Sequence, residues 1–231
     1  MNAGNGSKKP PPRPGRGPTG PSGTGSRRRR PAVLLIAVVV LFAVIGLYLV
    51  YRNSQGGQGN ASDASGYRHV AGEPGNGASA PDFTLTSGTG GQVALADFRG
   101  KTVLLYFQEG LSCQPCWDQI RDLERSRDAL TAAGVDEVVS ITTDQPNLIG
   151  RKAADEGITT PVLSDPTLAA STAYDANRYG MMGQMRDGHS FVLVGPDGVI
   201  DWRADYGGAP DYTMFLPTGT MLADMSAERA R

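Results

Sequence analysis

The chain has 231 residues, of which 22 are Lys or Arg and 23 are Asp or Glu, so it carries a net charge of −1. This length allows one folded domain with appendages. Residues 1–52 hold nine basic side chains and no acidic one, which leaves thirteen basic against twenty-three acidic side chains, or −10, in the remainder. So acidic a domain argues against nucleic acid as a partner. The two cysteines are too few for a four-cysteine zinc site.

The N-terminal part predicts a tail followed by a membrane helix. Residues 1–31 are basic and rich in Gly and Pro, which is typical of a disordered tail. Residues 32–51 are uncharged and would form a helix of about 30 Å, the thickness of a bilayer core. Basic residues lie mainly before this segment, so the positive-inside rule places the tail in the cytoplasm. We therefore expect a single-pass protein of the cell membrane with an extracytoplasmic domain.

Residues 52–79 are rich in Gly, Ser, Ala and Asn and predict a flexible linker before a domain over 80–231. Apolar runs typical of buried strands lie at 83–85, 92–95, 102–107, 137–142, 190–194 and 199–203. Helical spacing is found over 117–133, 147–156, 166–176 and 218–229. Asp165 is expected to cap the third of these helices at its N-terminus. Strands that alternate with helices, followed by a terminal hairpin, indicate an α/β domain with a mixed sheet.

The two cysteines lie together in the sequence Cys113-Gln114-Pro115-Cys116, between a predicted strand and a predicted helix. Unpaired N–H groups and the positive dipole end at a helix start stabilise a thiolate, which is the reactive form of cysteine. Pro115 suits the first helical turn, where its missing N–H costs nothing. The spacing therefore predicts a redox-active pair that forms a disulfide.

Four further stretches, taken in order around this pair, resemble the redoxin or AhpC/TSA branch of the thioredoxin superfamily. They are APDFTL at 80–85, LADFRGK at 95–101, VLSDP at 162–166 and FVLVGPDG at 191–198. The resemblance implies a thioredoxin-like fold, in which helices flank a mixed sheet and the dithiol lies at the carboxyl end of a strand. It covers several chemistries, so the site itself has to decide among them.

The preferred interpretation is a membrane-tethered thiol–disulfide oxidoreductase similar to the TlpA/ResA-type proteins. Cys113 would attack a target disulfide and Cys116 would resolve the mixed disulfide. The partners would be exported protein thiols and disulfides together with a membrane electron donor or acceptor, and no cofactor is needed. Glu109 either tunes the thiol or is a solvated loop carboxylate. Trp117 either contacts the substrate or packs the helix against the sheet.

One position departs from that family. Thioredoxin-like reductases have a cis-proline before the strand that faces the dithiol, and here that place is taken by Gly188.

The first alternative is a peroxiredoxin-like peroxide reductase, an antioxidant enzyme. The peroxiredoxin pattern Pro-x-x-x-Thr-x-x-Cys places Cys116 as the peroxidatic cysteine, Cys113 at the threonine and Glu109 at the proline. Gly188 falls where that family has an arginine, and Arg186 is a nearby substitute. A carboxylate beside the thiolate would raise its pKa, which is why we prefer the oxidoreductase at this point.

The second alternative is a Sco-like copper chaperone. Such proteins bind copper through two cysteines and a histidine, here Cys113, Cys116 and His189. Their cysteines are separated by three residues, whereas this chain has two between them. The methionines Met181, Met182 and Met185 are either soft ligands or adaptable packing residues.

Overall fold

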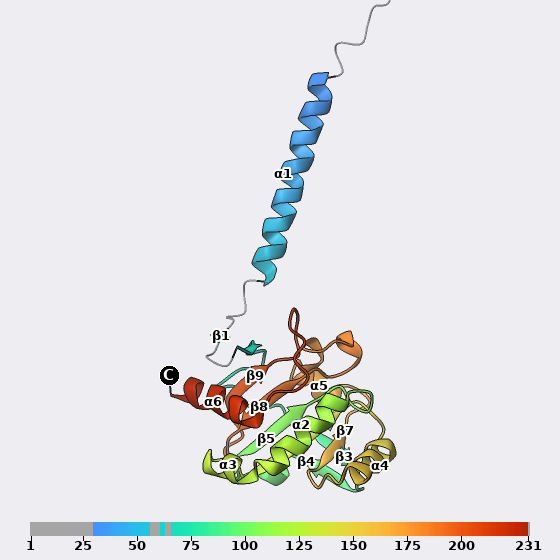
Figure 1. Ribbon diagram of the computed structural model, residues 1–231, viewed down its shortest axis with the longest axis vertical. Helices are drawn as coiled ribbons and strands as arrows, with labels where there is room; N and C mark the ends of the chain where they lie inside the picture. Colours follow the sequence, from blue (N-terminus) through green and yellow to red (C-terminus); the bar gives the residue numbers. More distant parts are fainter. Residues whose placement is uncertain (1–29, 56–60, 63–65, 231) are drawn as a thin grey trace, which may run out of the picture. The chain divides into compact units, whose positions relative to one another are not determined.

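The strand that leads to the cysteine pair, β5 (Val103–Phe107), lies inside a seven-stranded mixed sheet (Figure 1). The computed structural model describes residues 30–55, 61–62 and 66–230. Every residue of β5 is buried, as expected for a continuous apolar run that is covered on both faces. The predicted thioredoxin-like α/β fold is confirmed in this part of the chain.

The sheet has the order β4-β3-β7-β6-β5-β8-β9. Its other strands are β3 (Thr84–Ser87), β4 (Gln92–Ala94), β6 (Glu137–Thr142), β7 (Val162–Ser164), β8 (Ser190–Val194) and β9 (Ile200–Asp205). Strands β5, β6 and β7 are parallel, whereas β3 and β4 at one side and β8 and β9 at the other pair antiparallel. A short antiparallel pair, β1 (Ala61–Ser62) and β2 (Arg68–His69), stands apart from this sheet.

The register brings three chain segments together at one end of the strands. Phe107 at the end of β5 pairs with Ile141 of β6 and with Ser190 at the start of β8. The loops that follow β5 and β6 and the loop that precedes β8 therefore leave the sheet at the same level. Ligand and catalytic sites of open α/β sheets gather at such carboxyl ends.

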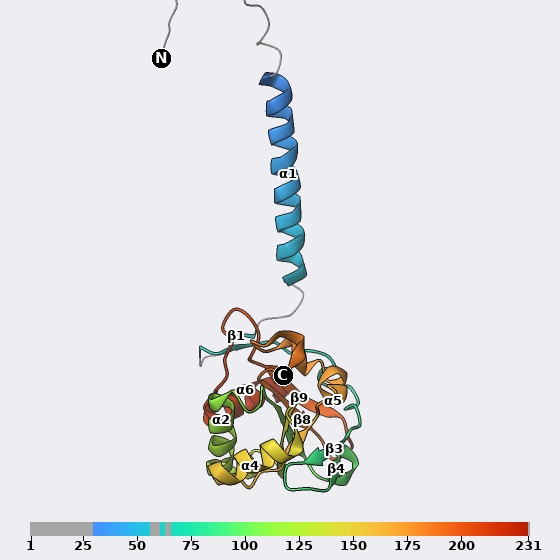
Figure 2. The same ribbon diagram turned by 90° about the vertical axis from the view of Figure 1, so that its right-hand side faces the viewer.

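The helices divide between the two faces of the sheet. They are α2 (Gln114–Arg125), α3 (Arg127–Ala132), α4 (Pro146–Glu156), α5 (Ala169–Ala173) and α6 (Thr218–Arg229). The connections β5–α2–α3–β6 and β6–α4–β7 step in the same direction, so right-handed crossovers place their helices on one face. The chain then returns from β7 to β8, and α5 lies on the opposite face (Figure 2).

Two apolar cores follow from this arrangement. Alternate residues of β5 point to opposite faces, so Leu104 and Tyr106 pack with helices α2, α3, α4 and α6. Leu105 and Phe107 pack on the other face with Ala170 of α5. Two 3-10 turns, η1 (Leu95–Phe98) and η2 (Ala176–Arg178), each contribute a residue to this second core. A third 3-10 turn, η3 (Gly183–Met185), contains no buried residue.

Helix α1 (Arg30–Gln55) includes the segment 32–51 that we predict to span a membrane. Within the residues that the structure describes, however, no helix is long and apolar enough to cross a bilayer. The chain divides into two compact units, Met1–Ser54 and Gln55–Arg231, and α1 belongs to the first except for its last residue. The predicted tail over 1–31 lies almost entirely outside the described residues.

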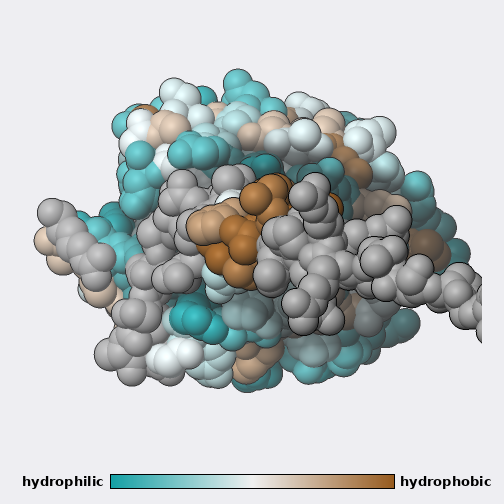
Figure 3. Space-filling view, turned by 90° about the horizontal axis from the view of Figure 1, so that it is seen from above, coloured by the Kyte–Doolittle hydropathy of each residue, from teal (hydrophilic) through white to brown (hydrophobic). Residues whose placement is uncertain are grey.

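Exposed large apolar side chains are concentrated in α1, between Leu35 and Tyr48. In the space-filling view, hydrophilic residues cover much of the face of the second unit that is drawn (Figure 3). In the second unit, the exposed large apolar side chains include Met181, Met182 and Met185.

The end of the predicted linker packs on the sheet instead of remaining a free tether. Val70 pairs with Asp205 and Ser79 with Val199. The Gly72 N–H also donates to Asp205 Oδ2 at 2.8 Å. Buried Arg203 holds the same carboxylate through two bonds of 2.8 and 3.0 Å. The linker composition did not indicate this contact, because the partner residues lie more than a hundred positions further along the chain.

Most predicted elements are present, with two helices that differ. The helix expected over 117–133 is interrupted at Ser126, whose ψ of 18° leaves the helical range and separates α2 from α3. The helix expected over 166–176 is reduced to α5, because Leu168 has a φ of +59° and cannot continue a right-handed helix. Asp165 is therefore not the formal cap, although its carboxylate accepts from the N–H groups of Ala169 and Ser171.

The buried Arg203–Asp205 pair generates a stability prediction. In the Asp205→Asn variant the guanidinium stays buried but loses its charged partner, and the free energy of unfolding should fall by about 3 kcal/mol or more. Urea unfolding followed by circular dichroism measures this change. Lys101→Gln is the control, since it breaks an exposed ion pair with Glu137 that solvent screens and that should contribute little to stability. Equal effects of the two substitutions would contradict the prediction.

Candidate redox site

The two cysteines form a disulfide at the N-terminus of α2, as predicted. Cys113 is the N-cap residue, and its Sγ accepts from the N–H of Cys116 at 3.3 Å. Pro115 lies in the first turn, where the sequence places it. Cys113 is 7% exposed and Cys116 is fully buried, and both sulfurs pack with Met214. Met214 follows β9 in a segment that carries no sequence signal for this contact.

The loop between β5 and α2 is held by its own backbone and by Trp117. The carbonyl of Gly110 accepts from the N–H of Cys113 at 3.0 Å and from Trp117 Nε1 at 3.1 Å. Trp117 is fully buried in the core between α2 and the sheet. Of the two roles considered for Trp117, the structure therefore supports packing, with a direct bond to the loop that precedes the cysteines.

Glu109 is buried rather than solvated. Its Oε1 accepts from the N–H of Met181 at 2.5 Å, which joins the β5–α2 loop to the segment that carries the three methionines. Its backbone carbonyl accepts from Arg186 Nη1 at 2.9 Å. The structure therefore gives Glu109 a structural partner, and Arg186 approaches the loop before the cysteines.

Asp144 is a site residue that the motif search did not identify. It follows β6, and its Oδ2 accepts from the N–H of Leu111 at 2.7 Å while its Oδ1 accepts from Arg186 at 3.0 Å. The signal that could have found it is topological, because an acidic residue after the parallel neighbour of β5 must lie near the end of β5.

Gly188 occupies a place where no side chain fits. A Cβ at this position would lie 1.4 Å from the carbonyl oxygen of Tyr179. The N–H of Gly188 donates to the carbonyl of Ala176, and the N–H of His189 donates to that of Tyr179. This close approach of two backbone segments explains why neither the proline of thioredoxin-like reductases nor the arginine of peroxiredoxins stands here.

The neighbours of Gly188 on both sides are buried ionisable groups. Asp187 is fully buried, and neither of its carboxylate oxygens has a hydrogen-bond partner among the described residues. Burial raises the pKa of Asp187 well above its usual range, and nearby Asp165 adds to this effect. Burial also lowers the pKa of His189 to about 3, so this imidazole is neutral.

His189 does not complete a copper site. Its ring lies 5.2 Å from that of Tyr106, 5.1 Å from that of Phe191 and 6.3 Å from that of Tyr206, in an aromatic cluster. Among the residues that the structure describes, no three His, Cys, Asp or Glu side chains are grouped so that they could hold a metal ion. Within the part of the chain that the structure describes, His189 therefore has aromatic neighbours and does not form a metal-binding group with the two cysteines.

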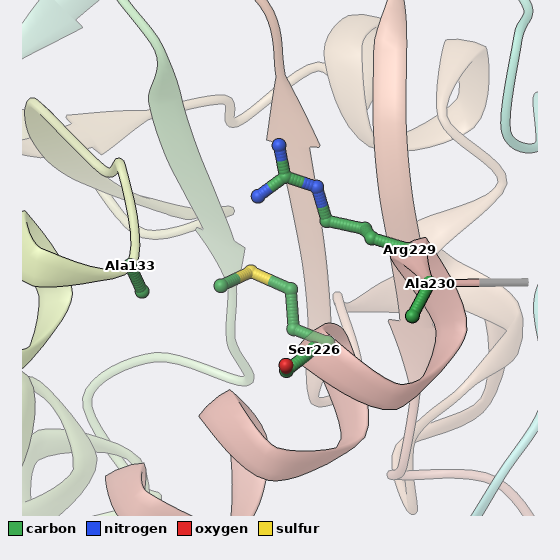
Figure 4. Close-up of a pocket in the computed structure, with 5 residues that line it drawn as sticks. Ala133, Ser226, Arg229 and Ala230 are labelled. Atoms are coloured by element: carbon green, nitrogen blue, oxygen red, sulfur yellow. The ribbon is translucent and has the colours of Figure 1, made fainter.

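A pocket elsewhere in the domain lies between the end of α3 and the last turns of α6 (Figure 4). It is lined by Ala133, Met225, Ser226, Arg229 and Ala230. None of these residues belongs to the predicted redox site.

Comparisons with known proteins find relatives among redox proteins. The model of the AhpC/TSA family matches residues 76–203. A Mycobacterium tuberculosis protein whose name assigns it to the peroxiredoxins is 37% identical over 126 residues, which cover 52% of this chain and 78% of that protein. Peroxiredoxin Bcp of Escherichia coli is 34% identical over 53% of this chain and 80% of its own length.

A third relative is named as a thiol–disulfide oxidoreductase and not as a peroxiredoxin. Thiol-disulfide oxidoreductase ResA of Geobacillus kaustophilus is 33% identical over 100 residues, which cover 43% of this chain and 56% of ResA. Among solved structures, peroxidoxin BcpB of Mycobacterium tuberculosis superposes with a TM-score of 0.55 at 18% identity, covering 66% of this chain and 96% of that one. The structural likeness supports the fold alone.

Gly188 generates a prediction about packing. The Gly188→Ala variant should lose about 2 kcal/mol or more of stability, because Tyr179 and the added methyl group cannot both keep their positions. Gly208→Ala is the matched control, since its Cβ would meet Tyr179 at an ordinary 3.5 Å. Urea unfolding of the two variants makes the comparison, and a Gly188→Ala protein as stable as Gly208→Ala would contradict this packing.

His189 generates a prediction about pH. Its pKa is lowered from 6.5 to about 3 by burial, so the unfolded chain binds a proton more readily than the folded one. The stability contributed by neutral His189 should be complete above pH 6.5 and should be lost as the pH falls toward 3. By pH 4 this loss should reach at most about 3 kcal/mol.

The His189→Phe variant should lack this contribution to the pH dependence. The test is urea unfolding of both proteins at pH 7 and pH 4. The parent should lose more stability between these pH values than the variant does. If the two proteins lose the same stability between these pH values, burial does not keep His189 neutral.

Proposed function

Because the chain belongs to the AhpC/TSA family, we propose that it is a redoxin that reduces peroxides with the Cys113–Cys116 pair. The observation that carries the proposal is an intrachain disulfide at the start of α2 in a domain whose relatives include proteins named as peroxiredoxins. The disulfide is the expected product of such a reaction. The comparisons thus favour the interpretation that we placed second from the sequence.

The reaction needs two thiols and one peroxide. A thiolate attacks one peroxide oxygen, the O–O bond breaks, and the sulfur becomes a sulfenic acid while an alcohol or water leaves. The second thiol attacks this sulfenic sulfur, an S–S bond forms, and water leaves. The dithiol is oxidised by two electrons and the peroxide is reduced by two. An external dithiol, or two external thiols, then has to reduce the disulfide before the next turnover and is itself oxidised to a disulfide.

Cys113 is the better candidate for the first attack. It is the more exposed of the two cysteines, and its sulfur accepts the Cys116 N–H at the positive end of α2. Both features favour a reactive thiolate. Cys116, buried one turn into the helix, would then close the disulfide. This order is the reverse of the one that the peroxiredoxin spacing predicts.

A second function, thiol–disulfide exchange, is favoured by one specific observation. The cysteines are separated by two residues and are already joined, and ResA is among the relatives. In this case the same thiolate would attack a protein disulfide instead of a peroxide. The two functions share the site and differ in the molecule that is reduced.

Location and partners remain proposals. We propose that the domain is extracytoplasmic and tethered through residues 32–51, which rests on the twenty uncharged residues and the basic segment before them. Its external reductant would then be a thiol protein or a membrane electron donor that reaches the same side.

Peroxide titration of the reduced protein distinguishes the two functions. One equivalent of hydrogen peroxide should consume two thiols and restore the disulfide. Cys116→Ser should stop at a sulfenic acid on Cys113 that dimedone traps, and the Cys113→Ser/Cys116→Ser double variant is the control. Insulin reduction is assayed in parallel. A reduced pair that is inert to stoichiometric peroxide but reduces insulin would replace the peroxidase with the oxidoreductase.

A further inference from the structure

We propose that Asp144 and Arg186 are positioning residues of the redox site, which orient the loop before Cys113. The inference rests on the proposed thiol chemistry of the cysteine pair. It concerns two residues that make no hydrogen bond to the sulfurs among the described contacts.

The peptide group between Gly110 and Leu111 links Asp144 to the backbone of Cys113. A peptide is planar and trans, so its C=O and N–H point in opposite directions and turn together. The C=O of this peptide faces the N–H of Cys113 and the indole N–H of Trp117. Its N–H donates to Asp144 at 2.7 Å. Asp144 therefore sets the direction of the carbonyl that holds the backbone of Cys113.

Gly110 has a backbone conformation that favours glycine. Its φ is +96°, which side chains of L-residues rarely tolerate. A Cβ at this position would also lie 1.8 Å from Asp144 Oδ2 and 2.6 Å from Thr142 Oγ1. The carboxylate of Asp144 thus occupies the space where a side chain at position 110 would lie. The loop can pack against this carboxylate only because position 110 is glycine.

Arg186 holds the peptide group between Glu109 and Gly110. Its Nη1 donates both to the carbonyl of Glu109 at 2.9 Å and to Asp144 Oδ1 at 3.0 Å. The two peptide groups that flank Gly110 are therefore both held from outside the loop. Asp144 is 9% and Arg186 is 29% exposed, so water competes only partly for these bonds.

The arrangement also ties the loop to the methionine segment. Arg186 follows η3, and the N–H of Met181 before η3 donates to the side chain of Glu109. Movement of this segment would be transmitted to the Gly110 peptide through Arg186. We call the hydrogen bonds of Asp144 and Arg186 to this loop the Asp144–Arg186 clamp. The clamp couples the exposed methionines to the backbone of Cys113.

The test is Asp144→Asn in the full chain. An asparagine of the same size can serve Leu111 or Arg186 as an acceptor, but its NH₂ group must then face the other donor, so one bond is lost. The rate of oxidation by hydrogen peroxide should fall about tenfold, and the equilibrium constant for disulfide formation against glutathione should fall about tenfold as well. Loss of a negative charge alone would lower the thiol pKa and act in the opposite direction on the thiolate.

Two further variants complete the design. Asp175→Asn is the matched control, because it removes a carboxylate that pairs with Arg178 and does not touch the loop. Arg186→Lys keeps the charge but cannot reproduce the two bonds of a guanidinium nitrogen in the same geometry, so it should have a smaller effect in the same direction. It also tests the inference if Asp144→Asn does not fold.

The possible results separate the two proposals. An Asp144→Asn or Arg186→Lys protein that melts like Asp175→Asn, but reacts slowly and has a shifted glutathione equilibrium, supports the clamp. Folded variants that match Asp175→Asn in both measurements overturn it. A parent protein that reduces neither peroxide nor insulin overturns the proposed function, while the glutathione equilibrium still tests the clamp.

Discussion

The hydrogen bond from the Leu111 N–H to Asp144 is the interaction on which the redox site depends. It joins the carboxyl ends of β5 and β6, two parallel neighbours whose register brings their loops to one level. Through one rigid peptide it directs the Gly110 carbonyl toward Cys113 and Trp117. The N-terminus of α2, with both sulfurs, is thereby placed on the sheet by a polar contact as well as by apolar packing.

The segment before β8 shows a different constraint. Two pieces of backbone, at Tyr179 and Gly188, approach so closely that the second has to be glycine. Asp187 and His189 on either side are buried, and burial raises the pKa of Asp187 and lowers that of His189. This segment faces the end of β5 in the sheet and presents no side chain at the position where related redox proteins have one.

Local patterns predicted the elements of the site well. An apolar run, a dithiol and amphipathic spacing were enough for β5 and α2, and the helix expected over 147–156 is present as α4. The break at Ser126 was missed, since helical spacing continues through it and only packing separates α2 from α3. The burial of His189 among aromatic rings was missed as well, because distance along the chain says little about distance across the sheet.

By itself, the sequence determined that the cysteines stand at a helix start and pair with each other, because strand, proline and helical spacing are all local. It also determined the family, through short stretches in a fixed order. Only the tertiary structure decided that Asp144 and Arg186 reach the loop and that His189 is buried among aromatic rings. Strand order and register set these contacts, and they depend on pairing between segments that are separated by dozens of residues.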